Sequence, residues 1–265
     1  MNPQSTRAPA PKPTLEAALR DVDEHGVGIV DRALSTAQTD DIRERLWRAA
    51  GMADEHGIRT RGAVPADADT NNIRILELFN WDLAFVDLAM NETALTAVRH
   101  VLGERFLISN YTANITGPGS GSMRLHADQG YVMPPWPDKP LAVNTLWMID
   151  DFHEEVGATR YVPGTHLSRE SPDPDQTYPT VSIEGAAGSL IIMDGRVWHT
   201  SGENRTQNQY RSGILGYYVL PWLRAQRNWN AALRKDVVDS MDPEFLKLLG
   251  YTEGNTELFR RGWQK

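Results

Sequence analysis

The sequence predicts a mainly β protein with flanking helices, and two observations carry this prediction. Between residues 105 and 220 the chain contains many short apolar segments, separated by turns rich in glycine and proline. Such a succession of short strands is typical of a sandwich or a barrel. Helical periodicity is confined to the residues before 104 and after 221. We therefore expect a jelly roll, that is, a cupin-like double-stranded β-helix, with helices contributed by both ends of the chain.

The chain of 265 residues is predicted to form one domain behind a disordered tail. Residues 1–13 are rich in proline, alanine and polar side chains, a composition that disfavours a packed core. The domain over 14–265 divides into a helical N-terminal part (14–104), a β-helix core (105–220) and a helical C-terminal tail (221–265). Apolar residues make up 40% of the sequence, so a substantial core can be buried.

The helices of the N-terminal part are predicted from apolar residues at helical spacing. Thr14 can cap the first helix, and Gly51 is expected to end the second. The third helical region loses its period near Asn91, which indicates two short helices rather than one. The predicted helices are 14–26, 36–50 and 81–102. A short strand, 26–30, is predicted between the first two helices.

The core strands are predicted from short apolar or β-branched runs between turn residues. Turn signals such as 117–119, 163–164 and 194–195 contain glycine beside proline or aspartate and interrupt each run. The predicted strands are 106–115, 141–149, 159–162, 180–183, 189–193 and 212–220.

Composition excludes several classes of function. The net charge of −8 argues against nucleic acid as a binding partner and gives no attraction to an anionic membrane. The absence of cysteine excludes disulfides and thiol chemistry and fits the reducing cytoplasm, where we expect the protein. No apolar run is long enough for a membrane span, and the first residues do not resemble a signal peptide. A small-molecule partner is therefore expected, while the oligomeric state stays open.

Three residues form a candidate metal site. His126 and Asp128 are two positions apart, so on one strand both side chains would point to the same face. His199 follows another apolar segment and is expected on a neighbouring strand. Two imidazoles and one carboxylate on one face match the facial triad of non-haem Fe(II) oxygenases. Taken alone, the His-x-Asp triplet is more often a surface hydrogen-bonded pair, and a strand-end histidine can be an ordinary interior residue.

Arg211 opens a very apolar strand and is the candidate for binding a carboxylate co-substrate. A cation that faces a barrel interior is costly unless an anion pairs with it. A carboxylate can do so through a bidentate contact with the guanidinium group. Arg205 is the competing candidate, but it lies in a polar loop, so Arg211 is preferred.

The ordered motifs resemble those of the phytanoyl-CoA dioxygenase-like family of Fe(II)/2-oxoglutarate-dependent oxygenases. The resemblance covers residues 72–219, although Met123 and Arg124 stand where many members carry glutamine. The motifs that carry it are Pro118-Gly119 and the segments 125–129, 147–151, 157–166 and 199–205, followed by Arg211-Ser212.

The resemblance implies Fe(II) as the metal, held by His126, Asp128 and His199, with 2-oxoglutarate and O2 as co-substrates. It also implies that Arg211 binds the distal carboxylate of 2-oxoglutarate. The further contacts that it implies for the co-substrate are Thr159, Ser201 and either Asn72 or Arg74.

The expected reaction is oxidation of a small organic molecule, most simply hydroxylation, with release of succinate and CO2. Secondary metabolism is the leading expectation for the setting, and an acyl-CoA or amino-acid hydroxylase stays open as an alternative. Desaturation, epoxidation and cyclisation are variants of the same step. Tyr131, Trp136 and Trp222 could line an apolar substrate pocket, or they could simply pack. Two alternatives stay open: a metal-dependent cupin-like isomerase or hydrolase, and a non-catalytic binding protein on an oxygenase scaffold.

Overall fold

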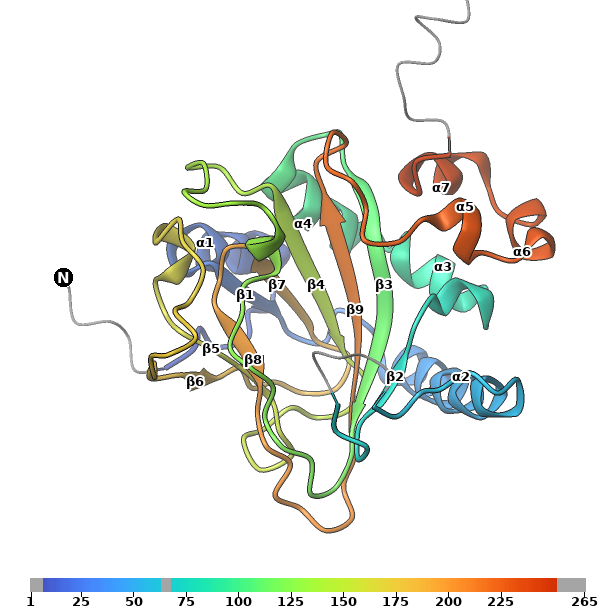
Figure 1. Cartoon of the computed structure of the whole chain (residues 1–265), viewed down its shortest axis with the longest axis horizontal. Helices are drawn as coiled ribbons and strands as arrows, with labels where there is room; N and C mark the ends of the chain where they lie inside the picture. The colour runs from blue at the N-terminus through green and yellow to red at the C-terminus, as the bar shows by residue number, and fades with distance from the viewer. Residues whose placement is uncertain (1–6, 63–67, 252–265) are drawn as a thin grey trace, which may run out of the picture.

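Two antiparallel β-sheets form the centre of the protein in the computed structural model, which describes residues 7–62 and 68–251 (Figure 1). The larger sheet has the order β1-β7-β4-β9-β3-β2, and the smaller sheet has the order β6-β5-β8. The strands are β1 (Val27–Val30), β2 (Ile73–Ile75), β3 (Leu107–Thr116), β4 (Ala142–Met148), β5 (Thr159–Tyr161), β6 (Val181–Ser182), β7 (Leu190–Asp194), β8 (His199–Ser201) and β9 (Arg211–Val219).

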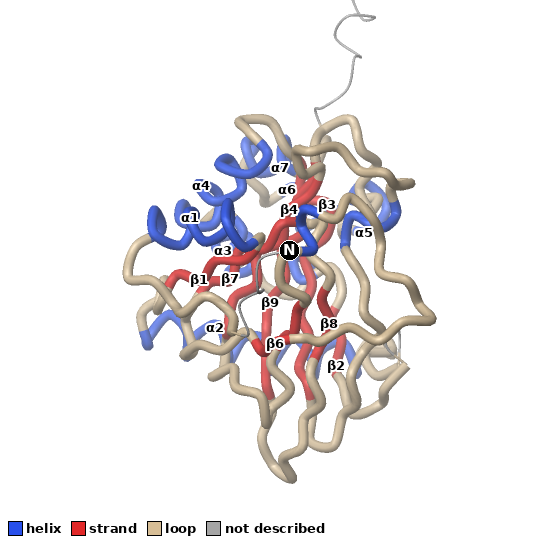
Figure 2. The backbone as a smooth tube through the Cα atoms, turned by 90° about the vertical axis from the view of Figure 1, so that its left-hand side faces the viewer, coloured by secondary structure: helices blue, strands red, loops and turns tan. Residues whose placement is uncertain are grey.

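Helices come from both ends of the described chain and cover the outer face of the larger sheet. Figure 2 shows α1 and α4 side by side against the strands, where they contact β1, β4 and β7. The helices are α1 (Leu15–His25), α2 (Thr36–Glu55), α3 (Ala84–Ala89), α4 (Glu92–Leu102), α5 (Trp229–Ala232), α6 (Lys235–Asp239) and α7 (Pro243–Leu248), with 3-10 turns η1 (Leu78–Asn80), η2 (Asp128–Tyr131) and η3 (Thr165–Leu167).

Alternating side chains of the larger sheet serve two separate cores. On β7, Leu190 and Ile192 pack in the cluster between sheet and helices. Ile191 and Met193 point the other way and pack in the cluster between the two sheets. This period of two is what a strand buried on both faces requires. The two packed sheets with their helical cover confirm the predicted mainly β jelly roll.

Most predicted elements are confirmed, with shifts of a few residues at their ends. Thr14 caps α1, and Asn91 caps α4 at the break between α3 and α4, as expected. The expected end of the second helix at Gly51 is wrong, because α2 continues to Glu55. The short strand β2 was not predicted at all, since three residues carry too little periodicity to be recognised.

The two ends of the chain are described in part. Lys12, expected in a disordered segment, pairs with β1: its backbone N–H donates to the Ile29 carbonyl at 2.8 Å. The C-terminal tail is helical over short stretches, α5 to α7. Residues 1–6 and 252–265 of the two predicted tails lie outside the described residues. Within the described ranges no helix is both long and apolar enough to cross a membrane.

Candidate active site

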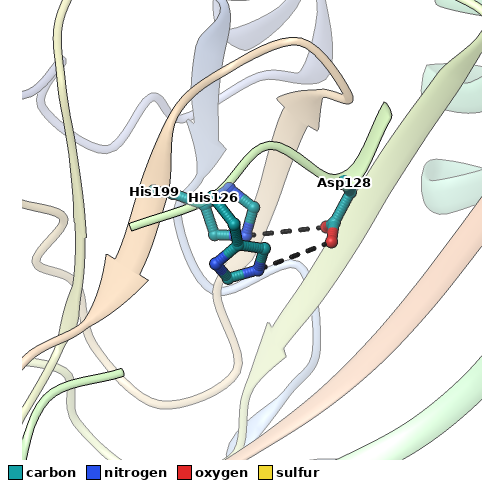
Figure 3. A group of neighbouring side chains, drawn as sticks. All are labelled: His126, Asp128 and His199. Carbon is teal, nitrogen blue, oxygen red and sulfur yellow. Dashed lines mark ion pairs between the residues drawn. The ribbon is translucent and has the colours of Figure 1, made fainter. Parts of the chain in front are cut away.

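The side chains of His126, Asp128 and His199 converge on one point (Figure 3). The Nε2 atom of His126 lies 3.6 Å from one carboxylate oxygen of Asp128. The Nε2 atom of His199 lies 3.6 Å from the other oxygen. One ligand atom from each residue falls within 4.8 Å of the other two, a spacing that a single metal ion can bridge.

Backbone pairing places the two histidines. His126 and His199 form an isolated antiparallel bridge, in which each amide N–H donates to the carbonyl of the other at 3.0 and 2.8 Å. The prediction that His126 and Asp128 lie on one strand is wrong, because Asp128 begins the turn η2. The two side chains still share a face, since Ala127 between them keeps an extended backbone (φ −116°, ψ 138°).

Hydrogen bonds to Nδ1 leave the Nε2 atoms of both histidines available to a metal. The Nδ1 atom of His126 lies 3.0 Å from the Arg124 carbonyl, and that of His199 lies 3.1 Å from the Val197 carbonyl. A carbonyl only accepts, so Nδ1 carries the proton in each ring. Burial and the neighbouring His126 lower the pKa of His199 to about 4, which keeps its imidazole neutral. Two imidazole nitrogens beside a carboxylate fit ferrous iron.

Asp128 is itself held from two directions. The Asn144 side-chain amide on β4 donates to its carboxylate oxygen at 2.6 Å. The Tyr217 hydroxyl on β9 donates to its backbone carbonyl at 3.0 Å. Burial raises the pKa of Tyr217 far above its ordinary value, so the hydroxyl keeps its proton. The larger sheet therefore fixes the carboxylate that completes the metal site.

The three residues open into a cavity of about 460 Å³ between the sheets. This volume lies in the range of small-molecule sites. The other residues that line it are Arg74, Leu76, Asn110, Thr112, Asn114, Met123, Asn144, Leu146, Thr159, Thr200, Ser201, Arg211, Leu215, Tyr217, Gln226 and Arg227.

Arg211 is the buried cation of this cavity, as its sequence position predicted. Its side chain is almost fully buried, and one terminal nitrogen donates to the Gly157 carbonyl at 2.6 Å. The guanidinium carbon lies 4.7 Å from the centre of the Phe152 ring, which packs against it. Arg205, the competing candidate, is more than half exposed and lies 3.7 Å from Glu154. The geometry therefore favours Arg211 as the anion-binding residue.

The residues implied for minor co-substrate contacts divide between the cavity wall and the core. Thr159 and Ser201 are paired neighbours on β5 and β8, and both line the cavity. Arg74 on β2 also lines it and approaches the Met123 sulfur at 3.6 Å. Asn72 is buried but is not among the cavity-lining residues, so Arg74 is the better placed of that pair.

The aromatic residues proposed for the substrate pocket lie elsewhere. Trp136 is fully buried, and its indole N–H donates to the Val132 carbonyl at 2.7 Å, which is a packing role. Trp222 is 68% exposed. Tyr131 is half exposed, and its ring centre lies 6.3 Å from that of Tyr217. None of the three is among the residues that line the cavity.

Sequence reasoning missed the polar face of β3. Asn110, Thr112 and Asn114 line the cavity, while the intervening Tyr111 and Ala113 pack in the helix-covered core. Polar residues at every second position of a strand that is otherwise apolar are a usable signal for a cavity inside a barrel.

The family model for phytanoyl-CoA dioxygenase (PhyH) matches residues 22–213. The chain belongs to the phytanoyl-CoA dioxygenase family. The match includes the metal-site residues and Arg211, and it covers every strand except most of β9.

Relatives of known name agree with this membership. Dioxygenase af480 of Aspergillus fumigatus is 36% identical over 238 residues, which cover 89% of this chain and 76% of the relative. The Fe(II)/2-oxoglutarate-dependent dioxygenase nvfF of Aspergillus novofumigatus is 26% identical, covering 86% of this chain and 79% of the relative. This phytanoyl-CoA dioxygenase family member is a 2-oxoglutarate-dependent dioxygenase.

A solved structure shares the fold. HygX from Streptomyces hygroscopicus, solved with nickel, 2-oxoglutarate and hygromycin B, superposes with a TM-score of 0.64 at 15% identity. The superposition covers 80% of this chain and 89% of HygX. At this identity the likeness concerns the arrangement of the strands and not the substrate.

Proposed function

We propose that this dioxygenase hydroxylates a small organic molecule of secondary metabolism, with Fe(II) held by His126, Asp128 and His199. The observation that carries the proposal is one cavity whose wall contains both the three ligand residues and the buried Arg211. The three ligand residues can bind an iron ion, and the buried cation can bind a carboxylate group of a dicarboxylate in the same cavity. Several named relatives are dioxygenases of fungi, in keeping with such a setting.

For the co-substrate we assign the distal carboxylate of 2-oxoglutarate to Arg211. The guanidinium is held in place by the Gly157 carbonyl and the Phe152 ring, so little side-chain freedom is lost on binding. Thr159 and Ser201 present hydroxyl groups to the same cavity and are proposed as further hydrogen-bond partners. Arg74 is proposed as the cationic contact on the β2 side.

The protein's part in the reaction is to hold and orient the reacting groups. Bound Fe(II) and 2-oxoglutarate activate O2 for oxidation of the substrate, with release of succinate and CO2. The Arg124 and Val197 carbonyls keep the two imidazoles in the tautomer that offers Nε2. Asn144 orients the carboxylate of Asp128. The two sheets contribute the walls of the cavity around these groups. A cytoplasmic location stays a prediction.

Anaerobic titration with Fe(II) and 2-oxoglutarate tests the assignment through the visible charge-transfer band of the chelated iron. The wild-type protein is expected to show the band, and His126→Ala to lose it. Arg211→Ala is expected to keep the band but to weaken 2-oxoglutarate binding by about 2–5 kcal/mol, because a buried charged contact is removed.

Matched substitutions outside the cavity serve as controls. Arg205→Ala removes an exposed arginine of the loop between β8 and β9 and should leave 2-oxoglutarate affinity unchanged. His56→Ala removes an exposed histidine and should leave the band intact. A band that survives in His126→Ala would refute the ligand assignment. Iron binding without any effect of 2-oxoglutarate would instead favour a cupin-like isomerase or hydrolase.

A further inference from the structure

A β-bulge in β3 lies beside the cavity and leaves backbone groups free for another segment. The pairing of β3 with β9 shifts register between Ile108 and Asn110, so Ser109 is the extra residue. Bulges of this kind disrupt the ladder locally and are over-represented next to active sites.

The segment 226–229 occupies the groups that the bulge exposes. The Gln226 backbone N–H donates to the Ser109 hydroxyl at 2.8 Å, and the Arg227 N–H donates to the Ser109 carbonyl at 3.0 Å. The Trp229 indole N–H donates to the Ile108 carbonyl at 2.7 Å. Ser109 and Trp229 are buried, so these bonds fix the segment firmly against β3.

This attachment places Gln226 and Arg227 on the cavity wall. The Arg227 guanidinium lies 3.3 Å from the Glu77 carboxylate, so its charge is balanced locally. Glu77 has a left-handed backbone (φ 51°), a conformation that costs energy for a residue with a side chain. Glu77, the residue with the strained backbone, is therefore the ion-pair partner of Arg227, which the contacts with the bulge hold at the cavity wall.

Asn110 stands next to this segment with one hydrogen-bonding atom unused. Its side-chain N–H donates to the Gln226 side-chain oxygen at 3.1 Å. Its own oxygen is buried and has no hydrogen-bond partner among the described residues. A buried acceptor without a donor is unfavourable, so the site favours a ligand that donates there.

The Asn110 end of the cavity is separate from the carboxylate-binding end. Along the β3–β9 ladder Asn110 pairs with Tyr217, while Arg211 pairs with Thr116 at the far end. The six residue steps between these two pairs correspond to about 20 Å of strand. Asn144, which holds Asp128, also pairs with Tyr217, so the Asn110 end adjoins the metal ligands. Apolar Leu76 and Leu215 complete the wall.

We propose that Asn110 and the segment 226–229 recognise the substrate, and that the substrate is an uncharged, mainly apolar alcohol. Its hydroxyl donates to the free Asn110 oxygen, and its apolar body contacts Leu76 and Leu215. A carboxylate is disfavoured because it has no proton to donate and because Glu77 already neutralises Arg227. This inference rests on the proposed function, since it assigns the other end of the cavity to the co-substrate.

Calorimetry on the anaerobic protein loaded with Fe(II) and 2-oxoglutarate tests the proposal with defined probes. Dodecanol, menthol and adamantanol are each compared with their methyl ether and with the carboxylic acid of the same skeleton. At least one alcohol is expected to bind about tenfold more tightly than its ether and its acid, because only the alcohol satisfies the buried acceptor. The proposal is overturned if no alcohol is preferred.

Substitutions at Asn110 separate recognition from packing. Asn110→Leu keeps the volume and removes the acceptor, so the alcohol and its ether should bind equally well. Asn110→Asp keeps an acceptor and should retain the preference for the alcohol. Arg224→Ala removes an exposed side chain of the same loop and serves as the control.

The charge-transfer band separates failure of this inference from failure of the proposed function. Absence of the band in the wild-type protein would reject the dioxygenase assignment itself. A normal band in Asn110→Leu shows that the variant is folded and loaded. If that variant still prefers the alcohol, Asn110 is not the recognition residue and the inference fails alone.

Discussion

His166 is a buried histidine outside the metal site, and its environment makes it sensitive to pH. Its side chain is buried, and neither ring nitrogen has a hydrogen-bond partner among the described residues. Burial lowers the pKa of His166, and nearby Arg196 acts in the same direction while Asp194 opposes it. The ring packs in the space beside Gly26.

The lowered pKa of His166 predicts a loss of stability in acid. An unfolded histidine titrates near 6.5, so between that pH and the lower folded pKa the unfolded state binds more protons. This contribution to stability is therefore complete above pH 6.5 and is lost as the pH falls. His166→Leu should flatten the decline in the urea midpoint between pH 8 and pH 5. His153→Leu, in a half-buried loop, is the control, and an unchanged slope in His166→Leu would contradict the assignment.

At the scale of elements, two glycines in neighbouring segments differ in the space available for a side chain. Gly28 lies where β1 meets α1, and a Cβ atom placed there would come 2.1 Å from the Ala18 carbonyl oxygen. Gly51 lies inside α2, and a Cβ atom there would meet nothing within 4 Å. The helix continues past Gly51 because its apolar face does, with Leu46 and Ala53 buried on either side. Packing outweighs a helix penalty of about 1 kcal/mol.

Alanine at these two positions should therefore change stability in opposite directions. Gly28→Ala forces β1 away from α1 and is expected to destabilise the protein by about 1–3 kcal/mol, as overpacking typically does. Gly51→Ala is expected to stabilise it by about 0.5–1 kcal/mol. Urea unfolding of the two variants beside the wild type measures both effects. Equal effects from the two substitutions would show that α1 and β1 are not in close contact.

At the scale of the whole molecule, the sequence predicts the chemistry better than the shape of the cavity. The metal residues and Arg211 are recognisable because each brings a costly polar group to an apolar segment. The substrate end depends on a contact between the bulge at Ser109 and the segment 226–229, which no local pattern reveals. Residue type alone predicts Trp136 as a pocket residue, but residue type does not distinguish a cavity wall from the core in which Trp136 is buried.

The metal site also links the sheets energetically, so ligand binding should stabilise the whole fold. A ligand at 100 times its Kd adds about 2.7 kcal/mol to the free energy of unfolding. Anaerobic Fe(II) is therefore expected to raise the thermal unfolding midpoint, and 2-oxoglutarate to raise it further. Differential scanning calorimetry should show no such rise for Asp128→Ala. Asp138→Ala, at an exposed loop position, is the control. A rise retained in Asp128→Ala would contradict the site.

The reciprocal backbone bridge between His126 and His199 joins two parts of the chain that a single proteolytic cut could separate. The exposed stretch 173–177 lies between these two residues in the sequence. A proteolytic nick there would leave His126 and Asp128 on one fragment, and His199 with Arg211 on the other. Neither fragment would own a complete iron site, so oxygen activation would require the two to reassociate through that bridge.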